Sequence, residues 1–162
     1  MGRAEKIPIG GVLQGRGLAA VRMMGIPDRP GVASRIFRVL GQAGINVELI
    51  THCLDDRGKS HITFCVERAR LEETLTLLES HGKEVGFEQM GFLSNVALIS
   101  VFGPHFRERH GIAGAFFHAL AGANINILAI STSVSTCTCL ISESELGKAT
   151  EALERVFEVP EG

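Results

Sequence analysis

The residues with the clearest chemical potential lie in the segment ProAspArgProGly at residues 27–31. Asp28 supplies a carboxylate there, and Gly31 lets a ligand approach the backbone closely because glycine has no Cβ. If a helix begins at this point, its first N–H groups and the positive end of its dipole attract a carboxylate. Asn46, farther along, offers both a donor and an acceptor. Together these groups complement the ammonium and carboxylate of an α-amino acid.

The same residue types also serve plain local structure. A segment of this composition is typical of a strand-to-helix turn, with Asp28 in the N-cap region and Pro30 in the first helical turn. An asparagine such as Asn46 at the start of a strand often bonds only to nearby backbone. Ligand binding and local structure therefore both remain open as interpretations.

The segment that holds these residues occurs twice in the chain. Residues 24–50 and 102–130 repeat one pattern, and from Gly31 and Gly111 onward they match at an offset of 80 residues. Matched positions carry identical or similar residues, among them Gly31 and Gly111, Phe37 and Phe117, Ile45 and Ile125, and Asn46 and Asn126. A register kept over this length indicates two structural units of one type.

Each copy has the hydrophobic pattern of a strand, a helix, two strands and a second helix. Apolar residues recur at helical spacing from Val32 and from Ile112, and Gly44 suits the left-handed position after the first helix. Second helices are predicted from Leu71, and from Leu146 to about Phe157. The predicted strands are residues 18–25, 45–53 and 60–67 in the first copy and 96–103, 125–133 and 136–142 in the second.

A fourth strand at residues 84–92 completes a ferredoxin-like βαββαβ unit in the first copy. The second copy ends without such a strand, whereas residues 7–15 form an apolar stretch ahead of the first copy. We therefore predict an α+β fold of two ferredoxin-like units. The first unit spans residues 16–92 and is inserted into the second, which consists of residues 7–15 and 93–159 with the N-terminal strand completing its sheet.

Composition excludes several classes of function. The 162 residues carry 16 basic and 18 acidic side chains, so no basic surface for nucleic acid or an anionic membrane is expected. No apolar run reaches membrane-spanning length and no leader pattern is present, so we expect a cytoplasmic chain. The glycine-rich residues 10–17 lack both nucleotide-binding motifs, and no nucleophile is grouped with a base. We expect no cofactor and no catalytic activity.

Cysteine and histidine residues leave a second class of function open. Cys137 and Cys139 are two apart on a predicted strand, so both face one side, and sulfur with imidazole suits zinc, nickel or copper. Free cysteine is also among the most buried residue types, so these residues are equally typical of a core. The candidate ligands of such a metal sensor are His52, Cys53, His61, Cys65, Cys137 and Cys139.

Three motifs give the chain a family resemblance: GIPDRPGVASRIF at 25–37, GINVELI at 44–50 and ANINILAISTS at 123–133. Together, in this order, they resemble the paired ACT domains of aspartate kinases, above all the separate regulatory chain that some of these kinases use. The resemblance covers roughly residues 7–157. It implies ferredoxin-like units, the inserted arrangement, and a bound amino acid, usually threonine or lysine.

The resemblance also implies which residues hold the effector. The predicted first site contains Asp28, Pro30, Gly31, Val32, Ala33, Asn46 and His52, and a second site would contain Gly111, Ile112, Ala113, Asn126, Ser131 and Thr132. The chain departs from the family at His52, where glutamine is usual, and at Val134, where glutamate is usual. No proline precedes Gly111. Because of these departures the effector stays open between threonine and lysine.

The sequence therefore predicts an amino-acid-binding regulatory protein rather than an enzyme. Edge strands of small sheets pair readily across chains, so we expect a homodimer with the ligand held between units of both chains, as the resemblance implies. A separate kinase catalytic chain is one expected partner, and the sequence is equally open to a free-standing sensor that acts on another enzyme or a transporter. The alternatives are a metal sensor and a purely structural dimerisation module.

Overall fold

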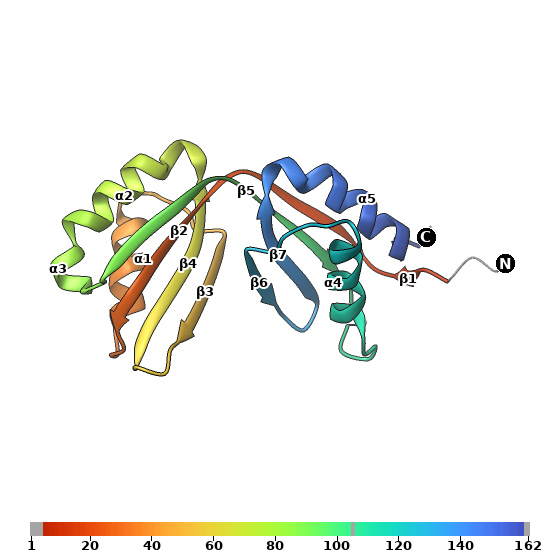
Figure 1. The fold of residues 1–162 in the computed structure, drawn as a ribbon, viewed down its shortest axis with the longest axis horizontal. Coiled ribbons are helices and arrows are strands. Elements are labelled where there is room, and N and C mark those ends of the chain that lie inside the picture. Colours follow the sequence, from red (N-terminus) through yellow and green to blue (C-terminus); the bar gives the residue numbers. More distant parts are fainter. Residues whose placement is uncertain (1–4, 105, 161–162) are drawn as a thin grey trace. The chain divides into compact units, whose positions relative to one another are not determined.

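The computed structural model describes residues 5–104 and 106–160, which form two compact units (Figure 1). We call Gly17–Asn95 the inserted unit, because the chain enters and leaves it from the other one. The outer unit consists of the described residues up to Arg16 together with those from Val96 onward. Each unit holds one copy of the repeat.

In the inserted unit, the strands and the longer helices follow each other in the order that the hydrophobic pattern predicts. The elements are β2 (Gly11–Pro27, from Gly17 on), α1 (Val32–Gln42), β3 (Leu49–Leu54), β4 (Lys59–Glu67), the 3-10 turn η1 (Arg68–Arg70), α2 (Leu71–Ser80), the short α3 (Gly82–Val85) and the first part of β5 (Gln89–Phe102). Strand order is β3-β4-β2-β5, and β4 runs antiparallel to both β2 and β3. This confirms the ferredoxin-like prediction.

The outer unit repeats this order with a strand taken from the chain's beginning. It contains the second part of β5, α4 (Ile112–Gly122), β6 (Ala129–Thr132), β7 (Thr136–Ser142), the 3-10 turn η2 (Glu143–Glu145) and α5 (Leu146–Val156). Strand order is β2-β5-β7-β6, so the first residues of β2 take the place of a fourth strand. Just before β2, the Gly10 N–H donates to the Phe102 carbonyl at 2.6 Å.

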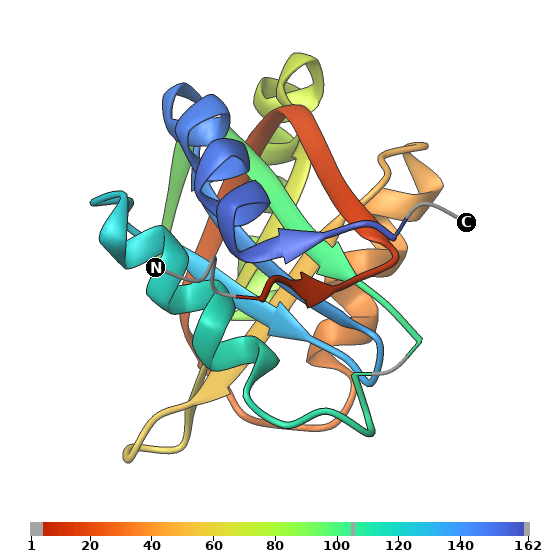
Figure 2. The ribbon, with the colours of Figure 1, turned by 90° about the vertical axis from the view of Figure 1, so that its right-hand side faces the viewer.

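The N-terminal stretch differs in detail from its prediction as one strand over residues 7–15. Ile7–Pro8 form a short β1 that pairs in parallel with β8, Phe157–Glu158 (Figure 2). The longer β2 begins at Gly11 and continues through Pro27. Phe157, predicted as the last apolar residue of a helix, is instead a buried residue of β8. The Ile9 N–H donates to the Glu158 carbonyl at 2.8 Å, so the two chain ends satisfy each other's backbone groups.

Three other predicted strands begin later than expected. Residues 84–92 contain the end of α3, and β5 begins only at Gln89. After Gly44, at φ 69, the Ile45 N–H donates back to the Leu40 carbonyl, so residues that read as a strand first complete the end of α1. Asn124, at φ 56, takes the same left-handed position after α4. Strands β3 and β6 therefore begin later than the predicted 45–53 and 125–133.

Each unit has its own hydrophobic core between its helices and one face of its sheet. In the inserted unit Ile36 and Leu40 of α1 pack with Phe64 of β4, and the Phe37 ring meets Phe64 edge-on at 5.5 Å between centroids. The outer core has the same plan, with Ile99, Phe116, Leu120 and Leu153 fully buried. This packing holds the start of each first helix against the end of a strand. None of the described helices is long and apolar enough to cross a membrane.

Deleting residues 1–15 should loosen the outer unit selectively. The deletion removes the β1–β8 pairing, the strand beside the second part of β5, and Ile9, whose side chain is buried in the outer core. We expect faster hydrogen exchange in β7 and α5, with α1 and β4 unchanged, measured by mass spectrometry on the full and shortened chains. Equal acceleration in both units would contradict this assignment.

Candidate functional site

The first predicted site lies where β2 ends and α1 begins. Gly31 is the N-cap of α1 with φ 93, and no side chain caps the helix. Pro30 therefore precedes the helix instead of lying in its first turn, and Asp28 does not cap it. The first helical bond runs from the Arg35 N–H to the Gly31 carbonyl at 3.0 Å. A Cβ at Gly31 would meet no atom within 4 Å, so the left-handed backbone requires glycine while the space beside the first turn is open.

A hydrogen-bonded chain connects three polar side chains beside this helix start. The Ser60 hydroxyl donates to Asp28 Oδ1 at 3.3 Å, and His52 Nε2 lies 2.9 Å from the same hydroxyl. Ser60 is buried, whereas Asp28 and His52 are exposed. Because Ser60 is paired with Ile26 across β2 and β4, it stands at the end of the strand that leads into the site. This arrangement holds the Asp28 carboxylate in place beside α1.

Sequence reasoning did not single out Ser60. The sequence offers one hint of its role, because Ser60 is the polar residue that opens the predicted strand at 60–67. Its pairing with Ile26 depends on the register between two strands that are distant in the sequence.

The turn between β3 and β4 holds His52 and Ser60 in register. Asp55 Oδ1 accepts the backbone N–H groups of Arg57 and Lys59, and Asp55 Oδ2 lies 2.9 Å from His61 Nε2. The hydrogen bond with His61, followed by that with the Lys59 backbone, lowers the pKa of Asp55 to about 2. The Gly25 N–H faces the other nitrogen of His61 at 3.4 Å, which ties the turn back to β2.

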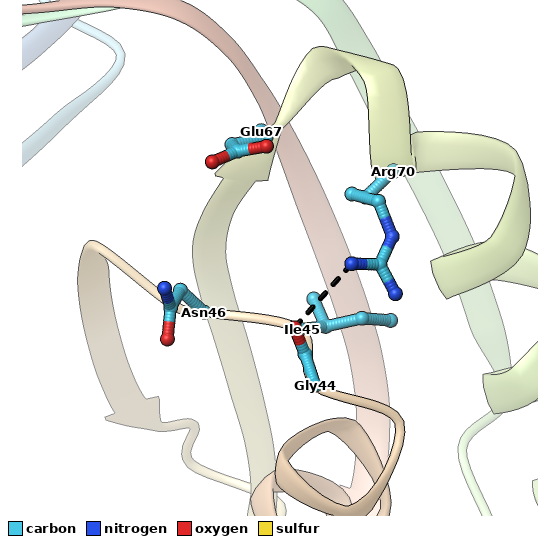
Figure 3. Close-up of a pocket in the computed structure, with 5 residues that line it drawn as sticks. All are labelled: Gly44, Ile45, Asn46, Glu67 and Arg70. Atoms are coloured by element: carbon cyan, nitrogen blue, oxygen red, sulfur yellow. Dashed lines mark hydrogen bonds between the residues drawn. The ribbon is translucent and has the colours of Figure 1, made fainter.

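Asn46 is not brought to this place within the inserted unit. It follows the C-terminal end of α1, and an 11-residue helix is roughly 16 Å long. Asn46, Glu67 and Arg70 are among the residues that line a polar pocket of about 30 Å³, a space of water size (Figure 3). The Arg70 guanidinium donates to the Gly44 carbonyl at 3.3 Å and so caps the end of α1.

The outer unit has a larger cavity at the start of α4, which we call the outer pocket. Its volume is about 290 Å³, and it brings together four residues of the predicted second site: Gly111, Ile112, Ala113 and Thr132. Gly111 is the N-cap of α4 at φ 87, again without a side-chain cap. Asn126 lies beyond the other end of α4, and Ser131 does not line the pocket. The remaining lining residues are Phe106, Arg109, His110, Ser133, Thr136 and Cys137.

Two differences in chain length accompany this pocket. Seven residues separate Gly103 from Gly111, two more than the five that separate Gly25 from Gly31. The hairpin of β6 and β7 is shorter, with strands of 4 and 7 residues in place of 6 and 9. The longer loop supplies Phe106, Arg109 and His110 as one wall, and the hairpin supplies Thr132 as the opposite one.

Among the described residues, no group of three or more His, Cys, Asp or Glu side chains is placed to hold a metal ion, as the metal-sensor hypothesis requires. Cys65, Cys137 and Cys139 are buried, and only Cys53 of the four is exposed. Burial raises the pKa of Cys65 and of Cys139 to about 12. The charge of Glu48 adds to this effect at Cys65, and Cys137 adds to it at Cys139. Burial alone raises the pKa of Cys137 to about 11. Three of the four sulfurs therefore favour the neutral thiol, which is a poor metal ligand.

Comparison with known proteins decides the family. A family model of the ACT domain matches residues 20–85, and a second ACT-domain model matches residues 99–157. The chain belongs to the ACT-domain family. Aspartokinase of Mycolicibacterium smegmatis is 34% identical over 96% of this ACT-domain chain and 39% of its own length. The chain thus spans about two fifths of the curated relatives it matches.

Two solved structures match this ACT-domain chain over nearly their full length. A crystal structure of aspartokinase alpha and beta subunits contains a chain that is 30% identical, with a TM-score of 0.83 and coverage of 91% of this chain and 97% of that one. The ligand-free regulatory subunit of aspartate kinase from Thermus thermophilus is 27% identical, also at 0.83, with coverage of 93% and 99%. The described part of the chain contains two ACT units and no further compact unit.

The four cysteines should differ sharply in reactivity. At pH 8 iodoacetamide should modify Cys53 first, because it is exposed, while the buried thiols of the other three stay neutral and shielded. Peptide mass spectrometry over a time course measures each rate, and the same reaction in denaturant is the control. Rapid native labelling of Cys137 or Cys139, suppressed by added zinc, would restore the metal-sensor hypothesis.

Proposed function

We propose that this ACT-domain chain is a regulatory protein of the aspartate-kinase type that binds a free amino acid. The observation that carries the proposal is the start of α1, which is uncapped and open, with the Asp28 carboxylate held beside it by Ser60. A positive helix start and a fixed carboxylate are complementary to the two charges of an α-amino acid. The likeness to the Thermus thermophilus regulatory subunit supports the same function.

Each predicted residue has a defined task in this proposal. The backbone N–H groups of Gly31, Val32 and Ala33 receive the ligand carboxylate, and Asp28 receives its ammonium. Pro30 borders the same turn, and His52 reaches the site through Ser60. Threonine and lysine are the two effectors proposed. Gly111 to Ala113 and Thr132 form the corresponding second site at the outer pocket.

Asn46 can contact the same ligand only from another chain, because α1 separates it from Asp28 within its own unit. We therefore propose a homodimer in which two chains complete each site. The edge strand β3 supports this assembly, since it exposes Ile50 and Leu54, by 48% and 55%. A ligand that binds only the assembled form favours that form, and a separate kinase catalytic chain would sense the change.

Replacing Asp28 tests the proposal directly. An amino acid at about 100 times its Kd stabilises a protein by about 2.7 kcal/mol, and Asp28→Ala should lose most of this gain with threonine or lysine. Dye-based thermal unfolding suits the measurement because the chain has no Trp or Tyr. Asp56→Ala, which removes an exposed carboxylate from the β3–β4 turn, is the matched control and should respond like the parent chain.

Two other outcomes would overturn the proposal. Equal stabilisation of Asp28→Ala and the parent chain would move the site elsewhere. No stabilisation of the parent by any of the twenty amino acids would favour the structural dimerisation module.

Asn46→Ala should also weaken binding, and mixing the two variants tests whether chains share a site. If Asp28 of one chain and Asn46 of another hold one ligand, co-refolding Asp28→Ala with Asn46→Ala regenerates some intact sites. Isothermal titration calorimetry should then detect binding that neither variant shows alone. A mixture as inactive as its components would contradict a site shared between chains, and parental binding by Asn46→Ala would remove Asn46 from the site.

A further inference from the structure

Arg109 is the permanently charged side chain among the residues that line the outer pocket. Its charged or titratable lining side chains are Arg109, His110 and Cys137, and neither Asp nor Glu is among its lining residues. Arg109 makes no hydrogen bond or ion pair within residues 5–104 and 106–160, so its guanidinium is available to a ligand. At the corresponding helix start of the inserted unit, Asp28 supplies a carboxylate instead.

The open start of α4 adds a second group that favours an anion. Gly111 holds the backbone left-handed, no side chain caps the helix, and the first helical bond comes only from the Ala115 N–H. The N–H groups of Ile112 and Ala113, both of which line the pocket, precede that bond. The helix start and the Arg109 guanidinium are thus two separate groups that attract negative charge. A cationic side chain placed here would face Arg109 with no carboxylate to pair with.

Size and polarity restrict the ligand further. A cavity of about 290 Å³ is at the small end of ligand sites, and so suits a compact molecule. Phe106, Ile112 and Cys137 form its apolar part, and the hydroxyl of Thr132 provides a neutral hydrogen-bonding group. Burial keeps the Cys137 thiol uncharged by raising its pKa to about 11, so no thiolate repels an anion.

We propose that the outer pocket binds a small organic dianion of the acidic amino acid or dicarboxylate class. One carboxylate lies at the start of α4 and the other pairs with Arg109, while an ammonium group is not required. This inference rests on the proposed function, since it specifies the ligand of the second ACT site. The two copies of one fold then respond to effectors of different charge.

Amide spectra of the full chain test this assignment residue by residue. Uniformly ¹⁵N-labelled protein is titrated separately with L-aspartate, succinate, L-lysine, L-threonine and inorganic phosphate. The amides of Gly111 and Ala113 report on the outer pocket, and those of Gly31 and Ala33 report on the first site. Aspartate and succinate should both shift the Gly111 and Ala113 signals, whereas lysine should leave them unmoved.

A pair of arginine variants provides the matched control. Arg109→Gln should weaken succinate binding about tenfold or more, because a hydrogen bond between charged groups is lost. Arg107→Gln removes the same charge from the same loop, but Arg107 does not line the pocket, so succinate should bind as it does to the parent. Both positions are exposed, and the amide spectra themselves verify that each variant is folded.

Three results would overturn the inference. The first is that aspartate and succinate leave the Gly111 and Ala113 amides unmoved, and the second is that Arg109→Gln does not weaken succinate binding. The third is that phosphate binds as tightly as succinate, which would make the pocket a general anion site. The proposed function is judged separately by threonine or lysine shifts at Gly31 and Ala33. Either assignment can therefore fail while the other stands.

Discussion

At Gly31 and Gly111 the backbone is left-handed, with φ of 93 and 87, and both candidate sites depend on this constraint. A residue with a Cβ is strained in that region, so only glycine turns the strand into the helix in this way without cost. The turn leaves the helix start without a side-chain cap, and in α1 the Val32 N–H makes only a long bond, 3.5 Å, to the Arg29 carbonyl. Hydrophobic packing of α1 and α4 then holds these starts rigidly beside the strand ends.

Around these two equivalent helix starts the chain places different chemistry. In the inserted unit a short loop places Asp28 within reach of Ser60, which also contacts His52. In the outer unit a longer loop and a shorter hairpin place Arg109 and Thr132 around a cavity. Both ACT units thus keep the left-handed glycine and the uncapped helix start, whereas the loops around the helix start decide the charge of the ligand that each site suits.

The far end of α1 has a structural task. Arg70 donates to the carbonyls of Ala43 and Gly44, so a cation satisfies the negative end of α1. Asn46 lies at this end, beside a pocket of water size. The length of α1 is therefore the reason why one ACT unit does not assemble all the residues that its motif contains.

The sequence by itself determined the repeat, the ferredoxin-like units and the left-handed position of Gly44, because helical spacing and glycine punctuation are local signals. It placed the first helix start at Asp28 and Pro30, whereas the structure has Gly31 there. The motifs at 25–37 and 44–50 were also enough to indicate the ACT family. Only the tertiary structure decided that Ser60 fixes Asp28, that Asn46 lies a helix length away, and that Phe157 belongs to β8. These features depend on strand register and on contacts between residues far apart in the chain, and no local pattern encodes such contacts.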